Sequence, residues 1–408
     1  MIAVLILLAV FLLISVRQIG SLKLEIWQIM SGGAVLALLG GSISFPDALK
    51  AVDYDVIIFL FGMFVCGALF EISGYLSYNQ HRIFKKADTC EKMLFLFIFF
   101  FGLSSALVMN DTVAVIGVPA SVSLSKRYNF PLKVLLLALA FSVTIGSVFS
   151  PIGNPQNLLI AIKSAMSNPF IVFLKYLFIP TVLNLFLLFL IFRAVYSRYF
   201  SDSPDMGHYT PEKKKWLYFL SNLTMAIILV GISAKIWFSL KGESFRLTWI
   251  AVFASMPALL LSFRQREIIK KTDWKTLVFF AAMFILMKSV WDSGFFQKII
   301  QSNTFDILSL PFIFILCVIL SQFISNVPLI ALLLPLFTLK GAQENHFIAL
   351  AAASTLAGNL SILGAASNVI IIQGAENRKE SSISFWDFFK IGAPLTALNC
   401  FIYWLFLR

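Results

Sequence analysis

The chain has 408 residues, of which 59% are hydrophobic and 15% aromatic, while only 13% are charged. Its mean hydropathy of +0.89 excludes a soluble globular protein and indicates an integral membrane protein embedded in a lipid bilayer. The net charge of +12 does not indicate a nucleic-acid partner, because the Lys and Arg residues lie in short loops between apolar segments, as membrane topology requires.

Apolar segments that approach the roughly 20 residues of a membrane helix follow one another along the whole chain. Residues 1–200 contain helices within 1–74, a two-part segment at 93–125, an interrupted helix at 131–162 and a helix at 170–196. After a polar linker at 201–214, residues 215–408 show the same order, with helices within 215–296, a two-part segment at 308–339, an interrupted helix at 346–373 and a helix at 385–407. We therefore predict an all-α polytopic membrane protein.

The two-part segments each carry a polar tip between two helical pieces, "MNDT" at 109–112 and "ISNVP" at 324–328. Several of the pieces are short for a full crossing, which favours a re-entrant helical hairpin over a pair of ordinary spans. Both alternatives leave the topology of the remaining helices unchanged.

The two halves of the chain align in order. "DYDVIIFLFGMF" (53–64) aligns with "DWKTLVFFAAMF" (273–284) at an offset of 220 residues. The tip residues Asn110 and Asn326 then match at an offset of 216, and Gly153 and Asn157 match Gly364 and Asn368 at an offset of 211. Three ordered matches with decreasing offsets indicate an internal repeat. An odd number of crossings separates corresponding points, so the repeats have inverted topology.

The basic residues predict the orientation. One side of the membrane receives loops with 22 of the 32 Lys and Arg residues. The positive-inside rule makes that side cytoplasmic, so both termini are expected outside and the protein is expected in the cell membrane.

The interrupted helices break at corresponding places, "SPIGNPQN" at 150–157 and "SILGAASN" at 361–368. Unpaired backbone groups are costly in hydrocarbon, so irregular chain at membrane depth is expected to face protein, water or a ligand. Freed carbonyls attract cations, and the N-terminal ends of the resuming half-helices favour anions. The breaks and tips therefore predict a central binding site.

Together, hairpin tips with "NDT" (110–112) and "SNV" (325–327), followed by broken helices with "GNPQN" and "GAASN", resemble the ion transporter superfamily. That group includes sodium/dicarboxylate and citrate symporters and arsenite efflux permeases. The Asn-Asp pair at the first tip makes the arsenite-efflux-like anion permeases the nearest likeness. The resemblance implies an elevator-type secondary transporter, usually a homodimer, with a static scaffold and a mobile transport domain.

The predicted function is secondary transport of a small anion, an inorganic oxyanion or an organic carboxylate, with Na⁺ or H⁺ as the coupling ion and no other cofactor. The predicted substrate- and ion-binding residues are Asn110, Asp111, Thr112, Gly153, Asn154, Gln156, Asn157, Ser325, Asn326, Gly364, Ser367 and Asn368. The candidate Na⁺ positions lie near Asn110, Gly153, Asn326 and Gly364.

Asp111 is the candidate coupling residue, because a carboxylate at membrane depth needs a cation or a proton. The same framework with Asp111 as the titrating group also suits a Na⁺/H⁺ antiporter, which remains the alternative. An enzyme is disfavoured, since the sequence contains no metal motif, catalytic triad or nucleotide-binding loop. Lys288 and Asp292 are expected to pair, because they are four residues apart in one helix.

Overall fold

The computed structural model describes residues 2–16, 18–19, 22–85, 87–164, 166–200, 214–295, 306–376 and 383–408, so nearly all of the predicted linker at 201–214 lies outside the described residues. The first half contains α1 (Ile2–Val16), β1 (Gln18–Ile19), β2 (Leu22–Lys23), α2 (Ile26–Leu39), α3 (Phe45–Ala51), α4 (Tyr54–Ser73), α5 (Tyr75–Phe84), α6 (Cys90–Val108), α7 (Asn110–Tyr128), α8 (Leu132–Ser147), α9 (Pro155–Lys163), α10 (Pro169–Val195) and η1 (Ser197–Tyr199). The second half contains α11 (Lys215–Leu240), α12 (Leu247–Leu260), α13 (Gln265–Lys271), α14 (Trp274–Asp292), α16 (Leu310–Ile324), α17 (Asn326–Leu339), α18 (Glu344–Leu356), η2 (Ala357–Asn359), η3 (Ile362–Gly364), α19 (Ala366–Glu376) and α20 (Phe385–Leu407).

Helices make up nearly all of the described regular structure, apart from the short antiparallel pairing of β1 with β2. Within the described ranges, six helices are long and apolar enough to cross a membrane: α4, α6, α10, α11, α14 and α20. Six shorter apolar helices accompany them. The chain is thus an all-helical membrane protein with several apolar spans. The short helices α3, α5 and α13 were not predicted from the sequence.

The helices that follow Asp53 and Asp273 begin and end in the same way. Asp53 accepts a hydrogen bond from the Val56 amide at the start of α4, and Asp273 accepts one from the Thr276 amide at the start of α14, both at 3.0 Å. These N-caps satisfy backbone donors that the first turn leaves free. Gly74 and Gly294, 220 residues apart, follow the two helices with positive φ angles of 70° and 73°. Only glycine adopts this conformation without steric cost.

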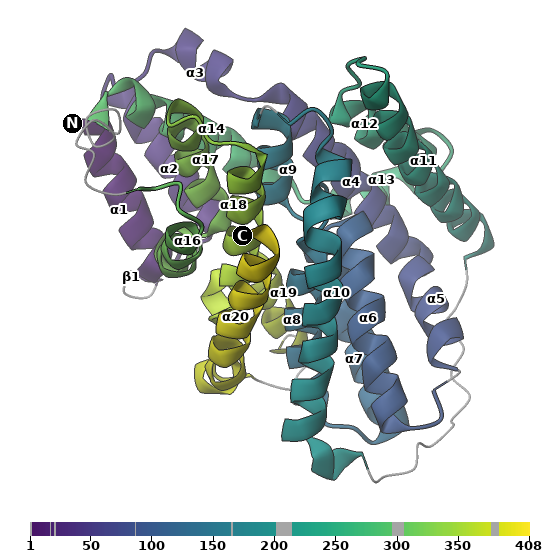
Figure 1. Cartoon of the computed structure of the whole chain (residues 1–408). Coiled ribbons are helices and arrows are strands. Elements are labelled where there is room, and N and C mark those ends of the chain that lie inside the picture. The colour runs from purple at the N-terminus through teal and green to yellow at the C-terminus, as the bar shows by residue number, and fades with distance from the viewer. Residues whose placement is uncertain are drawn as a thin grey trace.

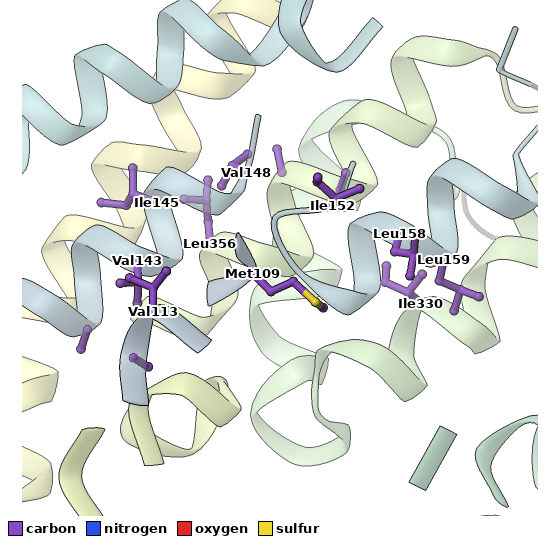
Figure 2. Packing of buried hydrophobic residues seen from close by; sticks show 14 of the residues in the cluster. Met109, Val113, Val143, Ile145, Val148, Ile152, Leu158, Leu159, Ile330 and Leu356 are labelled. Carbon is purple, nitrogen blue, oxygen red and sulfur yellow. The ribbon is translucent and has the colours of Figure 1, made fainter. Parts of the chain in front are cut away.

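The hairpin tips share an unusual backbone conformation. A single residue separates the two helices of each hairpin, Met109 between α6 and α7 and Ser325 between α16 and α17. Their φ angles are 69° and 72°, in the region that non-glycine residues seldom adopt. Figure 2 shows Met109 among buried apolar side chains that include Val148, Ile152 and Leu158. This packing holds the strained tip in place.

The first hairpin is longer than expected. Helices α6 and α7 have 19 residues each, or about 28 Å of helix, whereas α16 and α17 have 15 and 14. The prediction that several of the pieces are short therefore fits α16 and α17, whereas both helices of the first hairpin are longer. Its tip nevertheless lies at the break after α8, because the Asn110 amide donates to the Gly153 carbonyl at 2.8 Å, and α9 continues beyond that point for nine residues.

By their contacts the helices pack in two sets; Figure 1 shows α1 and α2 at one edge of the molecule and α11 and α12 at the other. The flanking helices are α1–α4 and α11–α14, in which α2 packs on α14 and α4 packs on α12. The hairpin bundle consists of α6–α10 and α16–α20, where each hairpin packs on a broken helix. Helices α4 and α14 point in opposite directions, since Glu71 at the end of α4 pairs with Lys271, just before α14, at 2.5 Å. We call this end of the molecule the Glu71 side and the opposite end the Asp53 side.

Close packing in the hairpin bundle depends on small residues. A Cβ atom on Gly146 of α8 would lie 2.0 Å from the backbone oxygen of Gly102 in α6. The two helices therefore touch through their backbones, as is common between membrane helices.

We predict that Gly146→Ala separates α6 from α8 and lowers the free energy of unfolding by about 1–3 kcal/mol. Gly32→Ala is the matched control, because nothing lies within 4 Å of a Cβ at this helical glycine. Thermal unfolding of the detergent-purified variants measures the difference. Equal melting temperatures for the two variants would contradict the described contact.

Candidate functional site

A cavity of about 620 Å³ lies where both hairpin tips and both breaks meet. The tips contribute Asn110, Asp111, Ser325 and Asn326, and the breaks contribute Pro155, Gln156, Ala365 and Ala366. The flanking helices form the opposite wall with Glu25, Trp27, Asp273, Lys275, Thr276, Phe279 and Phe280. Segments that are distant in sequence thus surround one cavity at the Glu71 side.

The first break is held together by Asn157. Its side-chain Nδ2 donates to the backbone carbonyls of Ser147, Val148 and Ser150 at 3.1–3.2 Å. Asn154 caps α9, since its Oδ1 accepts from the Asn157 amide at 2.8 Å. Both asparagines are fully buried. The carbonyls expected to be free for a cation are therefore already hydrogen bonded to an amide group.

The second break is held by the same kind of hydrogen bonds. Asn368 Nδ2 donates to the carbonyls of Gly358 and Ser361 at 2.7 and 3.3 Å. These partners stand 211 residues after Ser147 and Ser150, as Asn368 stands 211 residues after Asn157. Gln322 of α16 supplements this bonding, because its Nε2 donates to the Ala357 carbonyl at 2.9 Å.

Glycine is required at both breaks. A Cβ on Gly153 would lie 2.3 Å from the Ser147 oxygen, and one on Gly364 would lie 2.9 Å from the Ala357 oxygen. Each glycine lets the chain turn back against the end of the preceding helix. Both therefore shape the breaks from within the protein.

Thr355 joins the two breaks. Its Oγ1 accepts from Asn154 Nδ2 at 3.2 Å and from Gln156 Nε2 at 3.4 Å. The Thr355 hydroxyl in turn donates a hydrogen bond to Asn157 Oδ1 at 3.3 Å. Thr355 was not among the predicted site residues, although Thr144 stands 211 residues before it and could have indicated it.

The predicted site residues fall into three groups in the structure. Asn110, Asp111, Gln156, Ser325 and Asn326 line the cavity. Gly153, Asn154, Asn157, Gly364, Ser367 and Asn368 lie in or directly after the breaks, behind the cavity wall. Thr112 packs instead against Gly67 of α4, whose Cβ position lies 2.7 Å from the threonine oxygen.

Several buried oxygen atoms at the second break have no hydrogen-bond partner among the described residues: Asn326 Oδ1, Asn359 Oδ1, Ser367 Oγ and Asn368 Oδ1. Unpaired buried polar atoms are rare in folded proteins, and neutral oxygens are suitable ligands for a small hard cation. At the first break, the corresponding Oδ1 atoms of Asn110 and Asn157 have partners. The candidate Na⁺ position near Asn326 and Gly364 therefore fits these residues better than the one near Asn110 and Gly153.

The cavity balances charges of two kinds. Four helices of the hairpin bundle, α7, α9, α17 and α19, begin at its wall, as do α2 and α14 of the flanking helices, and each N-terminus acts as about half a positive charge. Among the described residues, the Asp111 carboxylate accepts no hydrogen bond and forms no ion pair, and the Asp273 carboxylate accepts hydrogen bonds from the Thr276 hydroxyl at 2.6 Å and the Thr276 amide. When ionised, these carboxylates oppose the positive helix termini.

Glu25 and Lys275 neutralise each other at the rim. The Lys275 ammonium lies 2.7 and 2.8 Å from the two Glu25 carboxylate oxygens. The hydrogen bond from Lys275 lowers the pKa of Glu25 below its ordinary value. The pair joins α2 to α14. This wall was not predicted, since nothing in the spacing of residues near 25 and 275 indicates their proximity.

Comparison with known proteins identifies the chain's family. Residues 4–344 match the family model CitMHS, described as citrate transporter. The chain belongs to this family. Its relatives include the silicon efflux transporter LSI3 of Oryza sativa subsp. japonica, 25% identical over 89% of this chain and 88% of that protein, and the P protein of Mus musculus, 22% identical over 90% of this chain and 55% of that protein.

Two solved structures share the fold. The YdaH transporter of Alcanivorax borkumensis matches with a TM-score of 0.57 and 15% identity, over 99% of this chain and 96% of that one. MtrF of Neisseria gonorrhoeae, described as illuminating a class of antimetabolite efflux pumps, matches with a TM-score of 0.59 and 13% identity, over 99% of this chain and 93% of that one. The resemblance to the ion transporter superfamily is confirmed, and the protein is a transporter and not an enzyme.

We predict that Asn157→Ala destabilises the protein by about 1–3 kcal/mol, because it removes the side-chain donor of three buried carbonyls, of which those of Ser147 and Ser150 keep a backbone amide donor. Asn368→Ala should have a similar effect at the second break. Asn222→Ala is the control, since Asn222 is exposed and its side chain donates only to Tyr218. Thermal unfolding reports the change, and a melting temperature for Asn157→Ala equal to that of the control would refute the structural role.

Proposed function

We propose that this chain is a secondary transporter that binds a small anion together with a cation in the cavity at the hairpin tips. The observation that carries the proposal is the convergence of four helix N-termini and the Asp111 carboxylate on one cavity. When Asp111 is ionised, its negative charge opposes the helix termini and lowers the affinity of the cavity for an anion. When a proton or Na⁺ neutralises Asp111, the helix termini dominate and an anion binds.

This balance couples the anion to the cation. A ligand shifts an equilibrium only by its differential affinity for the two states, and here the anion favours the neutralised state of Asp111. The volume of about 620 Å³ lies within the range of small-molecule sites. The substrate class that fits is a small oxyanion or carboxylate, in keeping with relatives described as citrate and silicon transporters.

The two halves of the chain act as inverted repeats in this proposal. Their helices, caps, positive-φ tips and break contacts recur at offsets of 220, 216 and 211 residues, and α4 and α14 point in opposite directions. The hairpin bundle serves as the mobile transport domain and the flanking helices as the scaffold, in an elevator-type motion. The positive-inside rule assigns the Glu71 side to the cytoplasm and both termini to the outside of the cell membrane.

A homodimer through the flanking helices completes the proposal. Helix α12 exposes Trp249, Phe253, Met256 and Leu260. A contiguous apolar face on a scaffold helix suits contact with a second subunit or with lipid.

A Na⁺/H⁺ antiporter on the same fold is the second candidate, favoured by the two carboxylates that face one cavity. The two functions differ in their dependence on the anion. Antiport of labelled Na⁺ against H⁺ would proceed in proteoliposomes without any candidate anion, whereas the proposed function requires one.

We predict that Asp111→Asn abolishes concentrative uptake of the accepted anion while exchange across the membrane persists. Proteoliposomes supplied with citrate, silicate or arsenite, and with a Na⁺ or a H⁺ gradient in turn, measure this. If H⁺ is the coupling ion, uptake by the wild-type protein falls as rising pH leaves Asp111 ionised, and the Asn variant loses that dependence.

Asp47→Asn is the control, because Asp47 is exposed in α3 and bonds to Ser44. Its uptake and pH profile should match the wild type. Unchanged gradient-driven uptake with an unchanged pH and Na⁺ profile in Asp111→Asn would show that coupling does not depend on this carboxylate.

A further inference from the structure

An ion pair between Lys163 and Asp53 joins the hairpin bundle to the flanking helices at the Asp53 side. Lys163 ends α9, and Asp53 caps α4. The other long-range ion pairs of the described residues stay within one of the two sets of helices: Glu71 with Lys271, Glu25 with Lys275 and Asp55 with Arg246 in the flanking helices, and Glu91 with Arg193 and Lys133 with Asp387 in the hairpin bundle. Movement of the bundle against the flanking helices must therefore separate Lys163 from Asp53.

The repeat shows that this contact is asymmetric. Asp273 corresponds to Asp53 at the offset of 220, but the residue that corresponds to Lys163 at the offset of 211 is Gly374. At the Glu71 side, the cavity separates Asp273 on α14 from the lining residues of α19. At the Asp53 side, the equivalent helices α4 and α9 are joined by the ion pair. The cavity thus separates the bundle from the flanking helices at the Glu71 side. At the Asp53 side the Lys163 ammonium, which has no counterpart in the second repeat, joins them.

The flanking helices do not show this asymmetry. The pair Lys275–Glu25 at the Glu71 side has a counterpart in Asp55–Arg246 at the Asp53 side, at offsets of 220 and 221 with the charges exchanged. Both pairs lie within the flanking helices and can persist while the bundle moves. The difference between the two sides is thus concentrated at Lys163.

Apolar packing beside Lys163 is incomplete. A second cavity of about 450 Å³ lies there between α9 and α17 of the bundle and α14 of the flanking helices, lined by residues that include Lys163, Leu159, Phe284, Met287 and Pro335. The bundle and the flanking helices therefore do not close tightly at this point. The ion pair, with Asp53 only 12% exposed, supplies a direct contact across the gap.

We propose that Lys163 and Asp53 form a latch that closes the Asp53 side, and that when the latch opens, Asp53 lines a cavity there in the position that Asp273 holds at the Glu71 side. The inference rests on the proposed alternating motion of the hairpin bundle. Lys163 is a positioning residue, since it acts through the placement of α9. Because Gly374 offers no equivalent ion pair, the latch favours the conformation with the cavity open at the Glu71 side.

The test measures side-specific access at two corresponding positions in a background without the four native cysteines. Val56→Cys reports on the Asp53 side, where Val56 is fully buried beside Asp53, and Thr276→Cys, 220 residues later, reports on the cavity at the Glu71 side. A membrane-impermeant thiol reagent is applied to intact cells and to inverted membrane vesicles. In the wild-type background, Thr276→Cys should react from the Glu71 side, and Val56→Cys should react slowly from either side.

Lys163→Gln should raise the labelling rate of Val56→Cys about twofold to fivefold, as loss of a partly exposed ion pair allows, and lower that of Thr276→Cys. Lys163→Arg keeps the charge and should restore both rates. Arg193→Gln, which breaks a pair within the bundle, is the matched control and should change neither rate.

Unchanged labelling of Val56→Cys in Lys163→Gln would overturn the latch, as would an equal rise in Arg193→Gln, which would indicate general loosening. Labelling needs neither substrate nor gradient, so the result is independent of the transport assay. A shift in access without transport of any tested anion would leave the latch standing and refute the proposed function. Transport without a shift in thiol access would support the proposed function and overturn the latch.

Discussion

The structure depends on how the backbone carbonyl and amide groups are hydrogen bonded where two helices end inside the protein. In a hydrocarbon environment, each free carbonyl or amide costs several kcal/mol, so a helix can end at membrane depth only if other groups bond its last turn. Asn157 and Asn368 supply those bonds with single amide groups, each to more than one carbonyl. The breaks can then exist without a ligand, and the resuming helices direct their N-termini at a common point.

Much of the fold follows from the sequence, because apolar runs and polar interruptions have direct physical meaning in a membrane. The helices, both tips and both breaks lie where the patterns of residues 93–125, 131–162, 308–339 and 346–373 indicate. The roles of the asparagines could not be predicted in the same way. An asparagine in a break can bind a ligand or a backbone carbonyl equally well. Only the tertiary structure shows that the Asn157 side chain donates to backbone carbonyls.

The parts of the site that were not predicted from the sequence all depend on long-range packing. Asp273, Glu25 and Lys275 reach the cavity from the flanking helices, which the sequence pattern assigns no polar role. Thr112 follows Asp111 directly, yet a helical step of 100° turns it toward Gly67 of α4 and away from the cavity. Long-range packing, which periodicity does not specify, decides both outcomes. The paired offset of 211 residues was the one sequence signal that could have revealed Thr355.

The repeats keep the same framework but divide the chemistry between them. The first tip has Asp111 where the second has Val327, and the second break has Ser367 where the first has Gln156. The Asn110 amide donates to the Gly153 carbonyl, so the first tip, which carries Asp111, is tied to its break. With the cavity open at the Glu71 side, Asp111 faces the same space as Asp273. Val327 lines that cavity as well, so in the opposite conformation of the proposed motion, repeat symmetry places both tips, Asp111 included, in the cavity beside Asp53. Asp111 then faces Asp273 in one state and Asp53 in the other. Lys163 lies beside Asp53, whereas the residue at the matching position for Asp273 is Gly374. The proposed function therefore gives the cation a different electrostatic environment on each side of the membrane, and a difference of this kind is what gradient coupling requires.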